Sequence, residues 1–408
     1  MNHQDHSSRW IRVACALAGV FAMLVSAAGA VAIGNSNIQI AGFFSQGWLY
    51  NSENNHPTRN DGGTWDFREM ALNASTPIGS HLRVGGQVFA QRFGSIGEDK
   101  VILDWAVADY NFTPAFGIRV GRVKYPKGLY GEALDLDVVR PFVFLPAAVY
   151  SPILRDFSAS FDGAMIYGAL SSAAGSFDYK LFHGDIPMSK EKGVAEFYNN
   201  SGLYSASGGG VQSLNMDSVT GGQLAWTTPI SGLKAVYSYS YYTNLSTDGP
   251  FAAAPMFNLH SNFKKFAWTT YSVEYVRNAW TFAAEWQRSR GGLAYAAAPV
   301  LATVNDHSGW DGWYGSVARR LNDKFEVGGY YGSLENNATT TSHSDPRVHQ
   351  RDTALSFRYD VNEHLLFKIE AHHIDGTYQT FNTARIPNPS GTTATKSTLI
   401  AIKTTLSF

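Results

Sequence analysis

Charged side chains are scarce in this sequence, and no basic excess is present. Asp, Glu, Lys and Arg make up 16% of the 408 residues, compared with about 25% in average soluble proteins. With a formal net charge of −1, the chain lacks the basic patch that binds nucleic acid, so we expect no nucleic-acid partner. The mean hydropathy of −0.17 is too polar for a bundle of membrane helices.

The sequence also lacks the common catalytic and metal-binding motifs. It contains no G-x-S-x-G and no H-E-x-x-H, which mark a serine nucleophile and a zinc site respectively. His183 and Asp185 could form an acid–base pair, but a loop histidine is the simpler interpretation. His372 and His373 are neighbours in a predicted strand, so their side chains point to opposite faces and are not expected to share a metal. We therefore expect no enzyme activity, no cofactor and no metal site.

The N-terminal segment has the layout of an export signal. Arg9 and Arg12 precede an apolar run over residues 13–25, and small residues follow, with cleavage sites after Ala30 or Ala32. An uncleaved membrane anchor is the alternative, because the run approaches the ~20 residues that a spanning helix needs. We expect 1–32 to be a cleaved signal peptide. The single cysteine lies inside it, so the mature chain would suit an oxidising compartment.

Beyond residue 33, apolar and polar side chains alternate along many short segments. Trp280, Phe282 and Trp286 fall on one face of such a segment, and Glu285 and Gln287 fall on the other. This period of two residues is typical of a strand with one apolar face. The same alternation recurs over 353–361, 365–372 and 397–408.

The connections between these segments distinguish a membrane barrel from a soluble sandwich, which would alternate as well. Short turns of the type Thr-Pro-Ile-Gly-Ser at 76–80 alternate with long polar stretches. Short turns on one rim and long loops on the other are typical of outer-membrane barrels, and closure removes exposed strand edges. The long stretches are expected at 51–63, 126–162, 187–215, 244–262, 291–308, 335–350 and 378–396.

The mature chain 33–408 is therefore predicted to be all-β: a transmembrane antiparallel β-barrel of sixteen strands, with fourteen or eighteen left open. An even number places both termini on the short-turn, periplasmic rim, and sixteen strands enclose an aqueous channel. The expected strands are 38–50, 64–76, 82–93, 100–112, 117–125, 163–170, 176–186, 216–228, 233–243, 263–276, 279–290, 309–319, 324–334, 351–361, 365–377 and 397–408.

Two parts of the chain carry a family resemblance. Residues 103–125 read LDWAVADYNFTPAFGIRVGRVKY, followed by PKGLYGEALD, by RPFVFLP at 140–146 and by VYSPILRDFSASFDGA at 149–164. Over about 60 residues this order resembles the phosphate-selective porin O and P family and related porins. The resemblance implies that 126–162 is a loop folded inward to constrict the channel, and that the protein is a homotrimer. The last strand and its terminal Phe408 resemble the C-terminal signature that the barrel assembly machinery of outer-membrane proteins reads.

The expected constriction differs from that family, whose anion selectivity is associated with a cluster of lysines. It carries charges of both signs, which would create a field across the channel and sort solutes by charge. Phosphate specificity is therefore not expected. The basic candidates are Lys127, Arg140 and Arg155, joined by Arg119, Arg122 and Lys124 of the preceding strand; the acidic candidates are Glu132, Asp135, Asp137, Asp156 and Asp162.

Within this set Arg155 and Asp156 are expected to form an ion pair. Together with Arg140 and Lys124 they are the predicted charges of the narrowest point. Six further charges fall on predicted inward faces, where they would keep the lumen wet or bind a solute. These lumen-facing candidates are Arg83, Lys234, Glu285, Arg358, Lys368 and Glu370.

The predicted function is passive diffusion of small hydrophilic solutes or ions through the outer membrane of a Gram-negative bacterium. Outer-membrane lipid and small solutes are then the expected partners. One alternative is a channel specific for an anion such as phosphate, or for another small solute. A second alternative is a non-conducting barrel that acts as an adhesin or an outer-membrane enzyme.

Overall fold

The computed structural model describes residues 31–32, 37–60, 62–190, 192–200, 203–337, 342–380 and 393–408. Sixteen long strands pair with their sequence neighbours in antiparallel fashion, and β18 pairs with β2, which closes the barrel. The strand number predicted from the sequence is therefore confirmed. The strands are β2 (Gln39–Asn51), β3 (Phe67–Ile78), β4 (Leu82–Phe93), β5 (Ile102–Thr113), β6 (Phe116–Lys124), β7 (Ser160–Ser172), β8 (Gly175–Asp185), β10 (Ser218–Thr227), β11 (Leu233–Phe251), β12 (Ala254–Arg277), β13 (Trp280–Ala297), β14 (Leu301–Arg320), β15 (Phe325–Asn336), β16 (His349–Asp360), β17 (Leu365–Gly376) and β18 (Lys396–Ser407).

Two short strands lie beside this wall. β1 (Val31–Ala32) pairs with β2, and β9 (Ser213–Asn215) pairs with the outer part of β11. Apart from the two residues of β1, the predicted signal peptide 1–32 lies outside the described residues. No helix among the described residues is long and apolar enough to cross a membrane.

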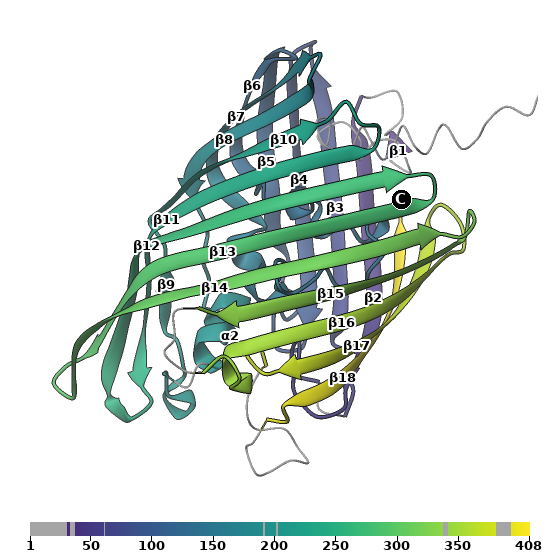
Figure 1. The fold of residues 1–408 in the computed structure, drawn as a ribbon. Helices are drawn as coiled ribbons and strands as arrows, with labels where there is room; N and C mark the ends of the chain where they lie inside the picture. Colours follow the sequence, from purple (N-terminus) through teal and green to yellow (C-terminus); the bar gives the residue numbers. More distant parts are fainter. Residues whose placement is uncertain are drawn as a thin grey trace, which may run out of the picture.

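Two of the predicted long loops are wrong. Residues 244–262 and 291–308 belong mostly to strands, because β11 and β12 continue to a turn at 252–253, and β13 and β14 continue to a turn at 298–300. The two hairpins project beyond the neighbouring strands (Figure 1). A strand that extends beyond the hydrocarbon needs no apolar face, so its sequence no longer alternates with a period of two residues. Its backbone can still pair with the neighbouring strand.

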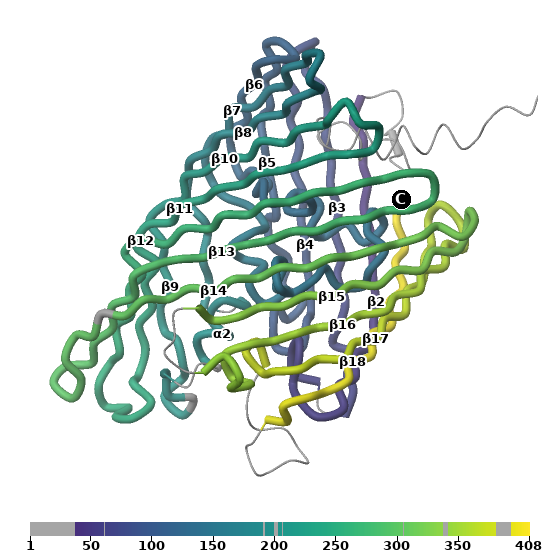
Figure 2. Tube along the Cα trace, viewed as in Figure 1, coloured from purple at the N-terminus to yellow at the C-terminus, as the bar shows by residue number. Residues whose placement is uncertain are grey.

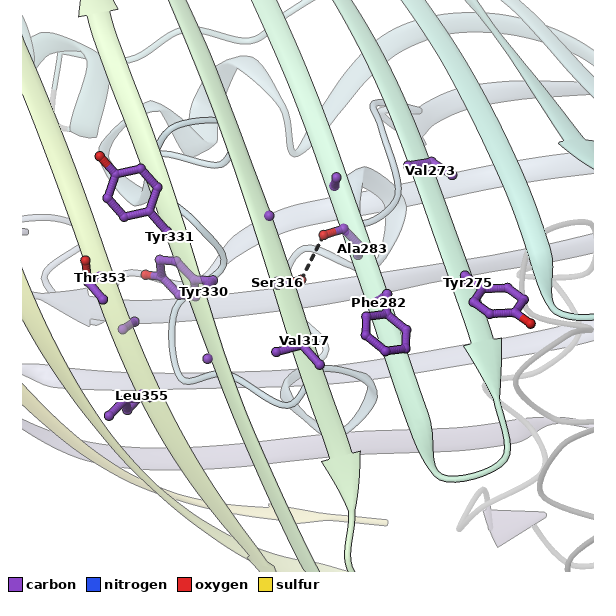
Figure 3. Close-up of a pocket in the computed structure, with 14 residues that line it drawn as sticks. Val273, Tyr275, Phe282, Ala283, Ser316, Val317, Tyr330, Tyr331, Thr353 and Leu355 are labelled. Atoms are coloured by element: carbon purple, nitrogen blue, oxygen red, sulfur yellow. Dashed lines mark hydrogen bonds between the residues drawn. The ribbon is translucent and has the colours of Figure 1, made fainter.

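The barrel is apolar outside and polar inside. Leu355 is 71% exposed and Ile369 is 50% exposed on the outer face, whereas Lys368 and Glu370, on either side of Ile369, are fully buried inside. Figure 3 shows a shallow groove on this outer face, lined by side chains such as Phe282, Val317 and Leu355. Exposed apolar residues recur around the whole wall, which is the distribution that lipid outside and water inside require.

The segment between β6 and β7 folds into the barrel. It contains three short helical turns, η1 (Gly131–Ala133), η2 (Asp137–Val139) and η3 (Pro152–Phe157). Short helical turns are visible within the barrel in Figure 1, and the strands surround them in Figure 2. The helix α2 (Gly193–Asn200), from the loop after β8, packs on η3. Two further turns, η4 (Ala206–Gly208) and η5 (Pro346–Val348), belong to other loops.

Candidate constriction site

The loop at 125–159 is attached first to the wall formed by β11 and β13. The carboxylate of Glu285 on β13 accepts a hydrogen bond from the backbone N–H of Leu129 at 2.8 Å and from the hydroxyl of Tyr150 at 2.7 Å. The backbone N–H of Gly128 donates to Ser238 Oγ on β11 at 3.0 Å. Glu285 therefore positions both ends of the loop.

A second attachment joins the middle of the loop to β16 and β17. Glu370 accepts from the backbone N–H groups of Val143 at 2.9 Å and Phe144 at 3.0 Å. Arg358 donates to the backbone oxygens of Val138 at 2.8 Å and Arg140 at 3.2 Å. Two of the predicted lumen-facing charges thus hold loop backbone, a role that the sequence analysis did not assign to them.

A third attachment is a buried ion cluster at β5. Asp135 accepts two hydrogen bonds from Arg155, both of 2.7 Å, and one from Lys124 at 2.8 Å. Asp104 on β5 contacts the same two cations, at 2.9 Å from Arg155 and 2.8 Å from Lys124. Burial alone would raise the pKa of Asp135, but Arg155 and Lys124 outweigh it and hold that pKa below its usual range. Following the order of neighbouring strands, β5 lies seven steps from β13 in one direction and nine in the other, so the loop touches nearly opposite walls.

The fourth attachment centres on Asp137 in η2. Its carboxylate lies 3.0 Å from Lys368 Nζ, 3.7 Å from Lys403 Nζ and 3.4 Å from Arg140 Nε, and it accepts from Thr405 Oγ1 at 2.7 Å. Burial would raise the pKa of Asp137, but the cations, Lys368 foremost, outweigh it and lower that pKa. Asp137 connects the loop to β17 and β18.

A group of charges at the wall of β5, β6 and β8 completes the site. Glu132 in η1 pairs with Lys180, and Arg119 lies 3.9 Å from Glu132 and 2.8 Å from Asp109. Burial would raise the pKa of Glu132, but Lys180 and Arg119 outweigh it and lower that pKa. This part of the inner wall therefore carries charges of both signs that contact one another.

Several predicted site residues lie elsewhere or have other partners. Arg122 pairs in register with Asp162 and binds it through Nε at 2.6 Å. Both alternate with Val123 and Phe161, which are fully buried inside, so Arg122 and Asp162 belong to the outer face near the loop rim. Arg122 is therefore not part of the constriction. It was grouped with Arg119, but the two residues are three positions apart in the strand and so point to opposite faces.

The predicted ion pair of Arg155 and Asp156 does not form. Arg155 binds Asp104 and Asp135 instead, and Asp156 lies 3.7 Å from Lys192. The two neighbours in sequence sit on a helical turn, which points their side chains in different directions. Lys127 is buried and donates to the backbone oxygen of Val149 at 2.7 Å.

The remaining lumen-facing candidates also lie on the inner face. Arg83 donates to Ser75 Oγ at 2.7 Å. Lys234 pairs in register with Glu274, and no carboxylate of the described chain comes within 4.0 Å of its Nζ. Lys234 is thus a cation of the inner wall without a close anionic partner.

Sequence reasoning missed four charged residues of the site. Asp104, Asp109, Lys180 and Lys403 all lie on inner strand faces and contact loop or wall charges. Lys180 and Lys403 carried a signal, because each is a charge on the polar face of an alternating strand. Asp104 and Asp109 lie five positions apart in β5 and would alternate to opposite faces, but a register shift beside Asp104 brings both inside. The partners of all four, distant in the sequence, could not be inferred.

The histidines follow the same rule of faces. His372 is buried inside, with its ring nitrogens 3.0 Å from Asp352 and 3.0 Å from Glu370, and His373 is exposed on the other face. His183 is a residue of β8 and not of a loop, and its Nδ1 lies 2.7 Å from Thr220 Oγ1. Among the described residues, no group of three or more His, Cys, Asp or Glu side chains could hold a metal ion.

The comparisons with known proteins agree on the fold. No family model matches the chain, and no curated protein matches it. The anion-selective porin from Comamonas acidovorans is 10% identical with a TM-score of 0.54, and the match covers 91% of this chain and 99% of that one. The outer membrane channel DcaP of Acinetobacter baumannii is 10% identical with a TM-score of 0.53, covering 93% and 100%.

A third similar structure is OmpT, an outer membrane protein of Vibrio cholerae, in its trimer form. It is 10% identical with a TM-score of 0.54, and the match covers 91% of this chain and 99% of that one. At such low identity the similarity shows the fold, which is that of porin-like outer-membrane β-barrels. Membership of the phosphate-selective porin O and P family is not confirmed.

Proposed function

We propose that this protein is a passive diffusion channel for small hydrophilic solutes in the outer membrane of a Gram-negative bacterium. The observation that carries the proposal is the inverted distribution of side chains: apolar outside, charged and hydrogen-bonding inside, around a loop held in the interior. A lumen lined by charges stays hydrated, and a hydrated lumen through an apolar belt conducts ions.

The proposed constriction is the part of the predicted segment 126–162 that precedes β7, residues 126–159. Its attachments to β5, β13, β16, β17 and β18 support a fixed narrowing and not a mobile lid. The charges proposed to meet the solute are Arg119, Glu132, Lys180 and Lys234, because their side chains are more exposed than those of Asp135, Asp137 and Arg155. Facing charges of both signs would orient polar solutes as they pass.

A phosphate-specific channel is the weaker alternative. The basic residues of the loop are bound to carboxylates or backbone oxygens: Arg155 to Asp135, Arg140 to Asp137, and Lys127 to Val149. They do not form a lysine cluster facing the solute. An adhesin or enzyme without a pore is the second alternative, which an absence of conductance would favour.

We further propose a homotrimer, surrounded by outer-membrane lipid and assembled through the C-terminal strand. The trimeric form of the similar OmpT structure supports this assembly. Phe408 is the last residue, and its backbone N–H and oxygen each bond to Gly42 at 3.0 Å. The strand ending in Phe408 therefore closes the barrel, which is the step that an assembly machine must complete.

The test is conductance of the purified mature protein in planar bilayers. We expect stepwise current increases that are linear in voltage and do not saturate with potassium chloride. Saturating currents in phosphate but not in chloride would favour the phosphate-specific alternative. Absence of steps, from protein shown by circular dichroism to be folded, would refute the channel.

Lys234→Gln tests which charges the solute meets. A unit charge 4 Å from an ion in water contributes about 1 kcal/mol, a change of about fivefold in local ion occupancy. The variant should shift the reversal potential in asymmetric potassium chloride towards cation preference. Lys324→Gln, at an exposed turn, is the matched control and should leave the potential unchanged. Equal potentials for both variants would exclude Lys234 from the conducting path.

A further inference from the structure

A shallow apolar groove crosses the outer face of β12 to β16, close to the rim of short turns (Figure 3). Its volume is about 600 Å³, within the range of about 300–1,000 Å³ that small-molecule sites occupy. The floor is low because Gly315 has no side chain, and a Cβ added there would meet no atom within 4 Å beyond its own chain neighbours. Ala284, its partner in register on β13, adds only a methyl group. The walls are larger outward side chains: Val273, Tyr275, Phe282, Val317, Tyr331 and Leu355.

One end of the groove is cationic. Strand pairing places Arg277 of β12 beside Trp280 of β13, and Trp280 beside Arg319 of β14, in the row of outward side chains next to the turns. The next row of outward side chains contains Tyr275 and Phe282 of the groove. Arg277 and Arg319 are exposed, and the guanidinium of Arg319 lies 4.9 Å above the ring of Trp280. The positive end therefore adjoins the apolar groove directly.

Neither cation has an anionic partner in the part of the chain that the structure describes. No carboxylate of those residues comes within 4.0 Å of the guanidinium of Arg277 or Arg319, and Arg277 Nη1 donates to the hydroxyl of Tyr275 at 3.2 Å. The opposite end of the same face differs, because Arg288 on β13 binds the carboxylate of Asp311 through Nε at 2.7 Å. The end near the short turns is therefore the one whose arginines lack a carboxylate.

The surroundings of the groove define the occupant. The outer face meets outer-membrane lipid, and the rim of short turns lies at the periplasmic leaflet. Arg277 and Arg319 are two strand spacings apart, about 10 Å between Cα atoms, so their long side chains can converge on one group in front of Trp280. Arginine binds phosphate through paired N–H donors, and tryptophan rings favour the boundary between headgroups and hydrocarbon. A phosphate with an attached hydrocarbon chain fits the cationic end and the groove together.

We propose that this face binds one glycerophospholipid of the periplasmic leaflet, with its phosphate between Arg277 and Arg319 and one acyl chain in the groove over Gly315. A free phosphate ion would leave the groove empty, and a hydrocarbon without a headgroup would leave the arginines without an anion. The site lies on the face opposite the lumen. It therefore does not depend on conduction, and a barrel without an open pore would bind the same lipid.

Native mass spectrometry of the mature protein in detergent counts the lipids that stay bound. After delipidation and addition of dioleoyl-phosphatidylglycerol, the wild type should retain one lipid per chain more tightly than any further ones. Arg277→Gln combined with Arg319→Gln should lower the fraction of chains with a bound lipid at least several-fold. Arg288→Gln is the matched control, because it removes an arginine that lies 4.9 Å above Trp286 on the same face but already has a carboxylate. Its lipid occupancy should match the wild type.

Gly315→Leu tests the groove without changing the charge. The added side chain fills the floor and should also lower the lipid occupancy at least several-fold. Gly292→Leu, in the projecting part of β13, is the control, because a Cβ added there is equally free of contacts and lies outside the groove. Glycerol 3-phosphate, which carries the phosphate but no acyl chain, should not displace the lipid at equal concentration.

The proposal is overturned if the double arginine variant binds lipid as the wild type does, or if Arg288→Gln lowers the occupancy as much as the double variant. Displacement by glycerol 3-phosphate would overturn it in favour of a simple phosphate site. A Gly315→Leu protein that separates into monomers but keeps its lipid would overturn it in favour of a second copy in the groove. If either variant does not fold, the other still decides. Conductance of the same preparations separates this result from the proposed channel, since lipid binding requires no open pore.

Discussion

Asp137 offers the most direct test of how the loop is held. Asp137→Asn keeps the size of the side chain but removes the anion from between Lys368 and Lys403. Removing one member of a buried ion pair costs about 3–5 kcal/mol, because the remaining charge has no counterion. Lys403 keeps a carboxylate, Glu69, at 2.6 Å, so Lys368 and Arg140 are the cations that lose theirs. We expect a loss of about 3 kcal/mol in the free energy of unfolding.

A double variant distinguishes a lost counterion from a lost shape. Replacing both charges of a buried pair by apolar groups of similar volume is often neutral. Asp137→Leu combined with Lys368→Met should therefore recover the part of the lost stability that comes from the unpaired Lys368, while Arg140 stays without its carboxylate. Asp323→Asn, at an exposed turn, is the matched control and should change stability by less than about 0.5 kcal/mol.

The measurements are urea unfolding in vesicles, followed by tryptophan fluorescence, and single-channel recording. Asp137→Asn should also give noisier and larger conductance steps, because the loop loses its attachment to β17 and β18. The reasoning fails if the free energy of unfolding of Asp137→Asn lies within about 0.5 kcal/mol of the wild-type value. It also fails if the conductance of Asp137→Asn is the same as that of the wild type and of Asp323→Asn.

The acid response of Asp137 has a definite sign. Its pKa is lowered in the folded protein from an ordinary value of 3.8, so its contribution is complete above that value and is lost as pH falls through the lower folded pKa. Asp137 therefore stays ionised at both pH 7 and pH 5, and the stability difference between wild type and Asp137→Asn should not shrink between those two values. A difference that shrinks between those two values would contradict the assigned partners.

Two further predictions concern the lipid belt and the C-terminus. Ile369→Lys places a charge on the outer face and should lower the free energy of unfolding in vesicles by about 2–4 kcal/mol. Glu363→Lys, at an exposed turn, should have little effect. Equal free energies of unfolding for the two variants would contradict the assignment of the outer face. Deleting Phe408 removes the residue that bonds to Gly42 and should reduce the amount of folded, heat-modifiable protein recovered from outer membranes. Ser407→Ala should not reduce it. A normal yield of the protein without Phe408 would refute a role of Phe408 in assembly.

Much of the fold follows from local alternation. A strand in lipid meets hydrocarbon on one side and water on the other whichever strands flank it, so the pattern around Phe282 and Glu285 is readable without knowing their neighbours. The same signal is missing from 244–262 and 291–308, where the hairpins extend beyond the neighbouring strands, and these strand segments were predicted as loops. Arg122 was misplaced for a different reason: it was grouped with Arg119 by nearness in sequence, although the two lie three positions apart and therefore point to opposite faces of the strand.

The sequence by itself predicted sixteen strands and the inner and outer faces of most of them, whereas the inward segment was expected only from the resemblance to a porin family. Only the tertiary structure decided what each inner charge binds. Lys368 and Asp137 are 231 residues apart, and Glu370 and Val143 are 227 apart. Closure of the barrel brings such residues together, and no local pattern encodes a contact whose distance depends on every strand in between.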